Sequence, residues 1–239
     1  MPGQAVIREG LMSGVRPRRH PPDTTGLRSS RATGRQGMLV ATCSRVDPMI
    51  HDPAAKGPPP VTTITTINPA TKEAIASYDL MSESRAFEKV EACHAAFLHW
   101  RTKTHEERAP LLRDTASALR ANADALSALM TKETGKLLRD GRTEVELCAQ
   151  LFEYAAEHGP TLLADEERTH SGGKKSGVVA YCPIGVVYSI QPWNFPVYQP
   201  VRVLASSLMA GNGVILKHAS ICTGSGLMLS DVCLEEGLP

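Results

Sequence analysis

The sequence lacks any run of about eighteen consecutive apolar residues, the length a membrane-spanning helix needs, and its start lacks a compact apolar stretch behind a basic one. We therefore expect a soluble, cytoplasmic protein. A dominant charge is also lacking, because 26 Lys and Arg residues against 25 Asp and Glu residues leave a formal net charge of +1. Such a chain has no global field to recruit nucleic acid or a membrane surface, so we expect neither as a partner.

Paired cysteines are lacking as well. No two of the six form a C-x-x-C pattern, and their wide spacing excludes a small disulfide framework. We expect reduced thiols that pack like small apolar side chains rather than act as nucleophiles. His105 and Glu106 begin an H-E-x-x-H pattern, but Ala109 stands where the second histidine should be, so no metal site is predicted. The cysteines are Cys43, Cys93, Cys148, Cys182, Cys222 and Cys233.

Aromatic residues are absent from residues 1–60, which carry nine Lys and Arg against four Asp and Glu and end in three prolines. This composition predicts a disordered basic leader. A transit peptide is an alternative for an Arg-rich start, but the acidic residues and the lack of an amphipathic period count against it. A natural start at Met38 or Met49 is another alternative, which would make the leader an artefact of gene calling.

Regular structure is predicted over residues 61–170, as one strand followed by four helices. The β-branched alternation of residues 62–67 predicts a half-buried strand, followed by a turn at residues 68–72. The first helix begins at Ser82 or Ser84 and places on one face the residues Ala86, Val90, Cys93, Phe97 and Trp100.

Capping signals set the other three helices. Thr104 and Glu107 form a capping-box pattern for a helix whose apolar stripe is Leu112, Ala116 and Leu119. Asn122 is a candidate cap for the third helix, which carries Leu126, Leu129 and Met130 and stops near Gly135. The fourth runs through Val145, Cys148, Phe152 and Ala155 and is predicted to end at the Gly159-Pro160 pair.

The remaining sequence alternates strands and helices. A polar loop with Gly172-Gly173 precedes residues 177–190, which read as two strands with a break. Strands at 186–190 and 214–217 then alternate with helices at 197–209 and about 223–236. This spacing predicts an α/β fold with an incomplete, doubly wound parallel sheet of the Rossmann-like kind over residues 186–239.

Two stretches carry candidate chemistry at the predicted strand ends, where ligands bind in such sheets. In Pro192–Pro196 (PWNFP), a rigid Asn194 amide could donate a hydrogen bond to a developing oxyanion, while the alternative is a turn whose Trp193 simply packs. Lys217 ends the next strand and could bond a ribose or phosphate, while the alternative is a solvated lysine.

These stretches resemble the aldehyde dehydrogenase superfamily, whose cofactor-domain signature is similar to PWNFP, AGNGVILK and EEGLP in this chain. INPAT, RAPLL and ETGK are similar to its amino-terminal part, so the resemblance covers about residues 65–239. Most of the superfamily has K-P-x-E where this chain has KHAS at Lys217–Ser220. That difference resembles the branch that includes succinate-semialdehyde dehydrogenases.

The resemblance implies roles for six residues. Asn194 would hold the substrate oxyanion, and Trp193 would line the cofactor channel beside the backbone of Ile190 and Gln191. Lys217 would bond the adenosine ribose, with Ser220 where a ribose-binding glutamate usually stands. A serine there implies that NAD or NADP is bound and that NADP is at least tolerated, with His218 near enough to favour its phosphate.

The resemblance also implies an aldehyde substrate, with succinate semialdehyde expected, a homo-oligomer in the intact family, and an oligomerisation hairpin over residues 171–187. The family's nucleophilic Cys in G-Q-x-C, its general-base Glu and its G-S-T-x-x-G turn do not occur in this sequence. Gly224-Ser225-Gly226 imitates the turn but reads as the first turn of a helix. We therefore expect an amino-terminal fragment that is inactive alone. The alternatives are a non-catalytic subunit that pairs with full-length relatives, or part of an acyl reductase.

Overall fold

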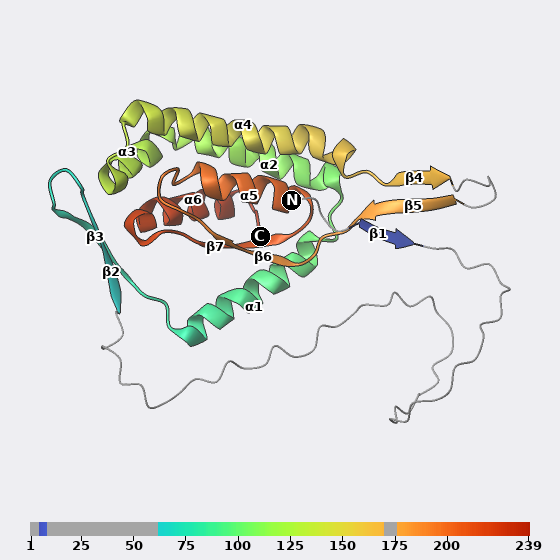
Figure 1. Cartoon of the computed structure of the whole chain (residues 1–239), viewed down its shortest axis with the longest axis horizontal. Helices are drawn as coiled ribbons and strands as arrows, with labels where there is room; N and C mark the ends of the chain where they lie inside the picture. The colour runs from blue at the N-terminus through green and yellow to red at the C-terminus, as the bar shows by residue number, and fades with distance from the viewer. Residues whose placement is uncertain (1–4, 9–61, 170–175) are drawn as a thin grey trace, which may run out of the picture. The chain divides into compact units, whose positions relative to one another are not determined.

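The computed structural model describes the backbone of residues 5–8 and the full structure of residues 62–169 and 176–239 (Figure 1). Most of the predicted leader and the predicted loop at Gly172-Gly173 lie outside these residues. Strand β1 (Ala5–Arg8) pairs antiparallel with β5 (Ser176–Tyr181), which also pairs antiparallel with β4 (Glu166–Thr169). Strand β4 begins before the range predicted for the hairpin, and the domain boundaries stay a prediction.

A second antiparallel pair opens the main part of the chain. Strand β2 (Thr63–Ile67) and the turn after it are where the sequence predicts them, and the Asn68 side chain accepts from the Ala70 backbone N–H at 2.9 Å. The chain then returns as β3 (Ala74–Asp79), which the sequence analysis missed. Strand β3 is weakly apolar and pairs only with β2 among the described strands, so its own composition gave little signal.

Helix α1 (Glu83–Trp100) begins at Ser82, whose side chain accepts from the Arg85 backbone N–H at 3.2 Å. The predicted apolar face is correct only toward the end of the helix. Phe97 and Trp100 are buried, whereas Val90 is 46% exposed. The reason is that α1 packs against strands β6 (Val186–Ile190) and β7 (Gly213–Lys217) through its carboxyl half, where a Cβ at Gly213 would lie 3.2 Å from the Cys93 sulfur.

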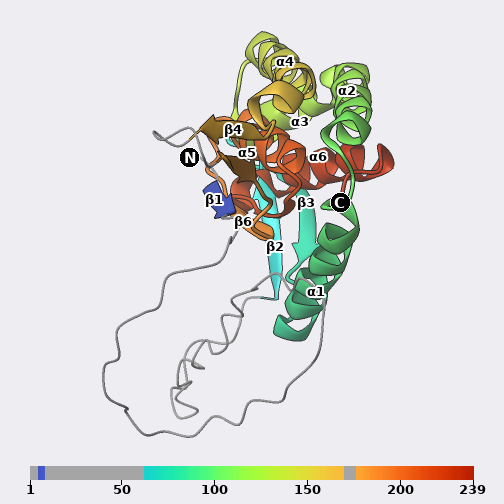
Figure 2. The same ribbon diagram turned by 90° about the vertical axis from the view of Figure 1, so that its right-hand side faces the viewer.

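Helices α2 (His105–Ala121), α3 (Ala123–Thr134) and α4 (Leu138–Leu162) form one side of the core, and α2 lies along α4 in both views (Figures 1 and 2). The capping box of Thr104 and Glu107 is confirmed. Asn122 is the N-cap residue of α3, as predicted, but its side chain makes no cap bond, because its amide donates to the Ala118 carbonyl at 2.9 Å. Fully buried core residues on these helices are Leu112, Ala116, Leu119, Leu126, Met130, Val145, Cys148 and Phe152.

Helix α4 does not stop at Gly159-Pro160 as predicted, but continues to Leu162. The glycine serves packing instead of termination, because a Cβ at Gly159 would lie 2.4 Å from Cγ of Met209 on the neighbouring helix α5 (Tyr198–Met209). Pro160 falls in the last turn, where one lost backbone donor costs little. The Leu163 N–H still closes the helix by donating to the Gly159 carbonyl at 2.9 Å.

The carboxyl-terminal part is a parallel β-α-β-α unit, as predicted. Strand β6 (Val186–Ile190), α5, β7 (Gly213–Lys217) and α6 (Thr223–Glu235) follow in order, with a short 3₁₀ helix, η1 (Ser220–Cys222), before α6. Strands β6 and β7 pair in parallel, with Val186 opposite Gly213 and Ile190 opposite Lys217. At the start of the pair, the Asn212 side chain accepts from the backbone N–H groups of Ile184 and Gly185 at 2.7 and 3.1 Å.

Candidate functional site

The carboxyl ends of β6 and β7 bring predicted site residues side by side. Ile190 and Lys217 are register partners, and the Gln191 backbone N–H donates to the Lys217 carbonyl at 3.0 Å. The Gln191 side chain donates to the Ser189 hydroxyl at 2.6 Å. Ile190 and Lys217 are exposed, so this edge presents an apolar side chain and a cation to solvent.

The Pro192–Pro196 loop follows β6 directly and is held from outside by two residues that the sequence analysis did not assign to it. The Lys136 ammonium donates to the Asn194 carbonyl at 3.2 Å and lies 4.0 Å from the centre of the Phe195 ring. His218 lies 2.6 Å from the Pro196 carbonyl through its Nε2 atom. The backbone from the Asn194 carbonyl to Pro196 is thus held, while the Asn194 residue itself is exposed.

Glu144 secures the point where this loop enters α5. Its carboxylate accepts from the backbone N–H groups of Val197 and Tyr198 at 2.8 and 2.9 Å and forms an ion pair with Lys136. The Glu144 side chain is 1% exposed and that of Lys136 is 14% exposed. A buried ion pair that also hydrogen-bonds to the backbone fixes geometry, because either partner alone would be an uncompensated charge.

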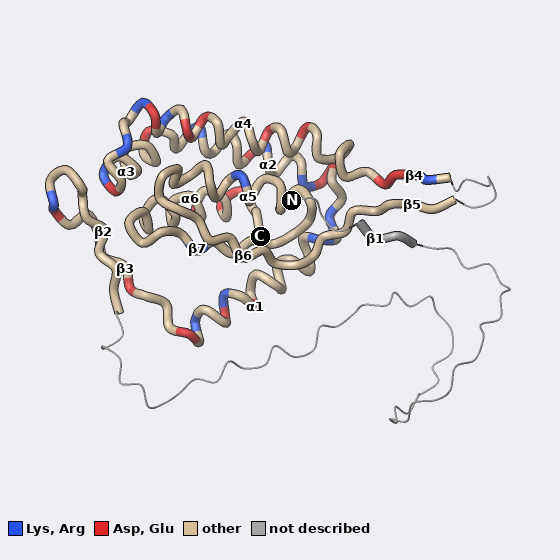
Figure 3. The backbone as a smooth tube through the Cα atoms, in the orientation of Figure 1, with Lys and Arg blue, Asp and Glu red and all other residues tan. Residues whose placement is uncertain are grey.

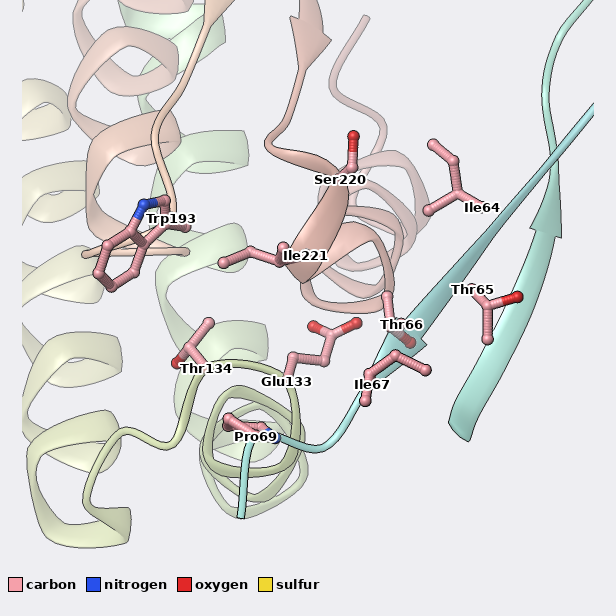
Figure 4. Close-up of a pocket in the computed structure, with 10 residues that line it drawn as sticks. All are labelled: Ile64, Thr65, Thr66, Ile67, Pro69, Glu133, Thr134, Trp193, Ser220 and Ile221. Atoms are coloured by element: carbon pink, nitrogen blue, oxygen red, sulfur yellow. The ribbon is translucent and has the colours of Figure 1, made fainter. Parts of the chain in front are cut away.

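An open pocket of about 280 Å³ lies beside the loop and brings Trp193 and Ser220 together (Figure 4). Ile190, Gln191, Asn194 and Lys217 do not line it. Trp193 is 54% exposed, so it is only partly packed against the rest of the described chain. The pocket is lined by Ile64, Thr65, Thr66, Ile67, Pro69, Glu133, Thr134, Trp193, Ser220 and Ile221.

Ser220 does not cap α6, which was the alternative to a cofactor role. It opens η1, and the N-cap residue of α6 is Cys222, which makes no side-chain cap bond. The cap is supplied from α3 instead. The buried Glu133 carboxylate accepts from the Gly224 backbone N–H at 2.8 Å, and Gly224-Ser225-Gly226 is the first turn of α6, as predicted. The anion-binding end of this helix is therefore filled by the chain's own carboxylate.

His218 does not face a ligand, contrary to the expectation that it favours a phosphate. Its ring is hydrogen-bonded inside the protein, and burial lowers its pKa. It is therefore neutral at pH 7 and gives no positive charge to the strand end. Lys217 is the cation that remains at this position.

Five of the six cysteines belong to the described part of the chain, and Cys43 lies outside it. Burial raises the pKa of the Cys93 and Cys148 thiols, and it raises those of Cys222 and Cys233 to about 12. These groups are thiols and not nucleophilic thiolates at neutral pH. Cys182 is exposed, between β5 and β6.

Charges of both signs alternate along α2, α3 and α4 (Figure 3). Across residues 62–169 and 176–239, no group of three or more His, Cys, Asp or Glu residues is placed to hold a metal ion. None of the helices in this same part of the chain is both long enough and apolar enough to cross a membrane.

A parallel strand-helix-strand unit with ligand-binding side chains at its carboxyl edge is the arrangement with which α/β enzymes bind nucleotide cofactors. The comparison with known proteins identifies the family within this broad class. The chain belongs to the aldehyde dehydrogenase family, whose model matches residues 58–239.

Individual relatives agree with this assignment. A succinate-semialdehyde dehydrogenase [NADP(+)] of Mycobacterium leprae is 40% identical over 178 residues, which are 74% of this chain and 39% of the relative. The crystal structure of succinic semialdehyde dehydrogenase from Streptococcus pyogenes in complex with NADP+ has a TM-score of 0.70 at 33% identity, over 74% of this chain and 38% of that one. That of succinate-semialdehyde dehydrogenase from Burkholderia pseudomallei has the same TM-score and identity, over 74% and 36%.

The chain spans about 39% of the length of the curated relatives it matches.

Residues to which the resemblance assigns no role also hold the candidate site together. Glu133 and Lys136 belong to the ETGK motif, and Glu144 lies eight positions beyond Lys136. The ETGK motif is the only sequence signal for Glu133 and Lys136, because the backbone groups that these residues and Glu144 contact are 53 to 92 positions away.

Proposed function

We propose that this chain forms the cofactor-binding and oxyanion-holding part of an enzyme that oxidises an aldehyde to the carboxylic acid with NADP, and that the aldehyde is succinate semialdehyde. The observation that carries the proposal is the pairing of Trp193 and Ser220 in one pocket beside the fixed loop that bears Asn194. The names of the Mycobacterium leprae and Streptococcus pyogenes relatives support the substrate and the cofactor.

The residues at the strand ends fit a dinucleotide. Lys217 supplies an exposed cation for a ribose or phosphate oxygen, Ser220 supplies a neutral hydroxyl, and Trp193 supplies an apolar surface. The carboxylate in the same pocket, Glu133, is already committed to the amino terminus of α6. When bound, the cofactor would accept the hydride that the aldehyde loses.

Asn194 would stabilise the oxyanion that develops on the aldehyde oxygen. A donor of this kind is effective when it is fixed before the reaction, because no reorganisation is then needed as charge develops. The contacts of Lys136 with the Asn194 carbonyl and of His218 with the Pro196 carbonyl support that rigidity. Removing one such donor typically lowers kcat by roughly a hundredfold to a thousandfold.

We propose further that the 239-residue polypeptide alone does not turn over aldehyde. Burial keeps the thiols of Cys93, Cys148, Cys222 and Cys233 protonated, and the G-Q-x-C pattern of the family nucleophile is not in this sequence. Incubation with succinate semialdehyde and NADP should therefore yield no NADPH. Turnover that is lost on alkylating cysteine would contradict this proposal.

The experiment that tests the cofactor role replaces the matching part of the Mycobacterium leprae relative with residues 62–239 and compares Ser220→Glu with Ser220→Gln. The two side chains have similar size and differ in charge. Two unit charges about 4 Å apart at an effective dielectric of about 20 repel by roughly 4 kcal/mol. Solvent reduces this, and a quarter of it, about 1 kcal/mol, is roughly a fivefold loss.

We expect Ser220→Glu to lower kcat/KM for NADP by about fivefold or more relative to NAD, and Ser220→Gln to leave the ratio near that of the parent. Calorimetric titration of the 239-residue chain with each cofactor gives a second measurement if the hybrid does not fold. Equal losses for NAD and NADP would remove Ser220 from the site.

A further inference from the structure

The ring of His218 joins two segments of the candidate site. Its Nε2 atom lies 2.6 Å from the carbonyl oxygen of Pro196, which ends the PWNFP loop. A carbonyl oxygen can only accept, so Nε2 carries the proton and Nδ1 does not. His218 itself stands between Lys217 and Ser220, the two residues proposed to meet the cofactor.

The unprotonated Nδ1 atom is engaged on the other side of the ring. It accepts from the Ala219 backbone N–H at 2.7 Å, and the Cys222 sulfur lies 3.1 Å away. The Cys222 thiol keeps its proton because burial raises its pKa to about 12. Both nitrogens are thus occupied in one tautomer, which links the start of η1 to the end of the PWNFP loop.

Packing leaves the ring little freedom to turn. A Cβ at Gly226 of α6 would lie 2.9 Å from Cδ2 of His218, so the first turn of α6 closes directly over the ring. The charged and titratable groups that act on the ring are Lys217 on its own strand, Glu133 from α3, Glu144 from α4 and the thiol of Cys222 in η1. The ring is therefore held by contacts, and its position follows that of residues 217–222.

We propose that His218 is a positioning residue that transmits the position of the nucleotide-side segment, residues 217–220, to the oxyanion loop through its hydrogen bond to Pro196. This proposal rests on the proposed function, since it assigns the two segments to cofactor and oxyanion. Nucleotide binding at Lys217 and Ser220 then tightens the loop that bears Asn194, and loss of the Nε2 donor uncouples them.

Two substitutions of His218 test the roles of the two ring nitrogens separately. In His218→Gln the terminal amide reaches about as far as Nε2 and can still donate to Pro196. In His218→Asn the amide reaches only about as far as Nδ1, so the contact with η1 is kept and the link to Pro196 is lost. The readout is the fast, local part of the Trp193 fluorescence anisotropy decay in the full 239-residue chain. Trp100 serves as an internal reference because it is buried and donates to the Leu208 carbonyl.

We expect the fast component of the Trp193 decay to be larger in His218→Asn than in the parent. The ratio of held to free loop should fall about fivefold, which corresponds to about 1 kcal/mol. His218→Gln should match the parent. A rise of equal size in both variants would show a role in general stability only, and no change in either would show that the link does not hold the loop. Both results overturn the proposal.

Should His218→Asn not fold, Gly226→Ala is the second variant, because its Cβ would displace the ring from Pro196. It is expected to raise the fast component, and an unchanged decay would count against the link. NADP is then titrated into the parent and His218→Gln, where it should reduce the fast component, and into His218→Asn, where the reduction should be smaller.

The titration separates the two proposals. Failure of the parent to bind NADP in calorimetry contradicts the proposed function, whereas the comparison of the free chains still tests the hydrogen-bonded link. If NADP binds with the same effect on Trp193 in all three proteins, only the proposed transmission by His218 is contradicted, and the proposed function is not.

Discussion

The Glu133 carboxylate holds Ser225 twice, accepting from its backbone N–H at 2.9 Å and from its hydroxyl at 2.6 Å. Both residues are buried, with Glu133 at 2% and Ser225 at 0% exposure. The carboxylate lies at the positive end of the α6 dipole, where a negative charge is stabilised. The end of α3 is thereby fixed to the start of α6, and η1 with Ser220 lies immediately before that point.

Glu133→Gln should lower the free energy of unfolding by about 2 kcal/mol, because a charge-assisted acceptor is lost and an amide N–H then faces backbone donors. Ser225→Ala removes only the hydroxyl contact and should cost about 1 kcal/mol. Urea unfolding followed by circular dichroism measures both. An unchanged midpoint for Glu133→Gln would mean that the cap contributes nothing to stability.

Lys136→Met should cost about 3 kcal/mol, because the buried Glu144 carboxylate loses its cation. In Lys136→Met/Glu144→Gln, the Gln oxygen can still accept from Val197 and Tyr198 and no charge is left buried. The double variant should therefore be more stable than Lys136→Met alone. Urea midpoints of the parent, Lys136→Met, Glu144→Gln and the double variant give the coupling energy, and strictly additive losses would contradict an ion pair that acts as one unit.

Gly159→Ala should destabilise the chain by about 1–3 kcal/mol, because the new Cβ would overlap Cγ of Met209. In a Met209→Ala background the clash is gone, and the same substitution should stabilise by up to about 1 kcal/mol through helix propensity. Thermal and urea unfolding of the cycle should show this change of sign. Destabilisation in both backgrounds would contradict the packing explanation for the glycine.

The stability of the parent should fall as the pH is lowered from about 7.5 to about 5.5. Burial lowers the pKa of His218 and of His105 in the folded chain, so the unfolded chain binds the proton first as pH drops below about 6.5. Stability is thus fully present above that pH and declines below it. His218→Gln and His105→Gln should each make the decline shallower, as measured by urea midpoints across the range. Parallel curves for all three proteins would contradict the shifts.

The elements that the sequence predicted are those whose signals are local. The capping box at Thr104, the end of α3 near Gly135 and the β-α-β-α alternation after Val186 each depend on residues a few positions apart. The failures depend on distant partners. Gly159 reads as a stop signal within its own helix, and only the approach of Met209, fifty positions later, shows that it serves packing.

The same distinction holds at the site. Asn194, Trp193 and Lys217 could be assigned because they stand in compact motifs at predicted strand ends. Lys136, Glu144 and Glu133 could not, because an isolated Lys or Glu on a helix usually points to solvent, and the backbone groups that they contact are 53 to 92 positions away. His218 was assigned to a phosphate because the sequence does not reveal which way a ring beside a strand end will turn.

The Asn212 side chain accepts hydrogen bonds from the backbone of Ile184 and Gly185, and these bonds fix where the pairing of β6 and β7 begins. Side chains alternate between the two faces of a strand, so a shift of one residue would exchange the faces of the whole strand. Deleting one residue from the turn at residues 210–212 would shift β7 by one position. Leu216, now opposite Ser189, would then point to the other face of the strand, and Lys217 would leave its place beside Ile190 at the proposed site. The length of this turn is consequently as strict a requirement for the proposed site as the identity of Lys217. Natural insertions in homologous chains should therefore not fall in the turn at residues 210–212.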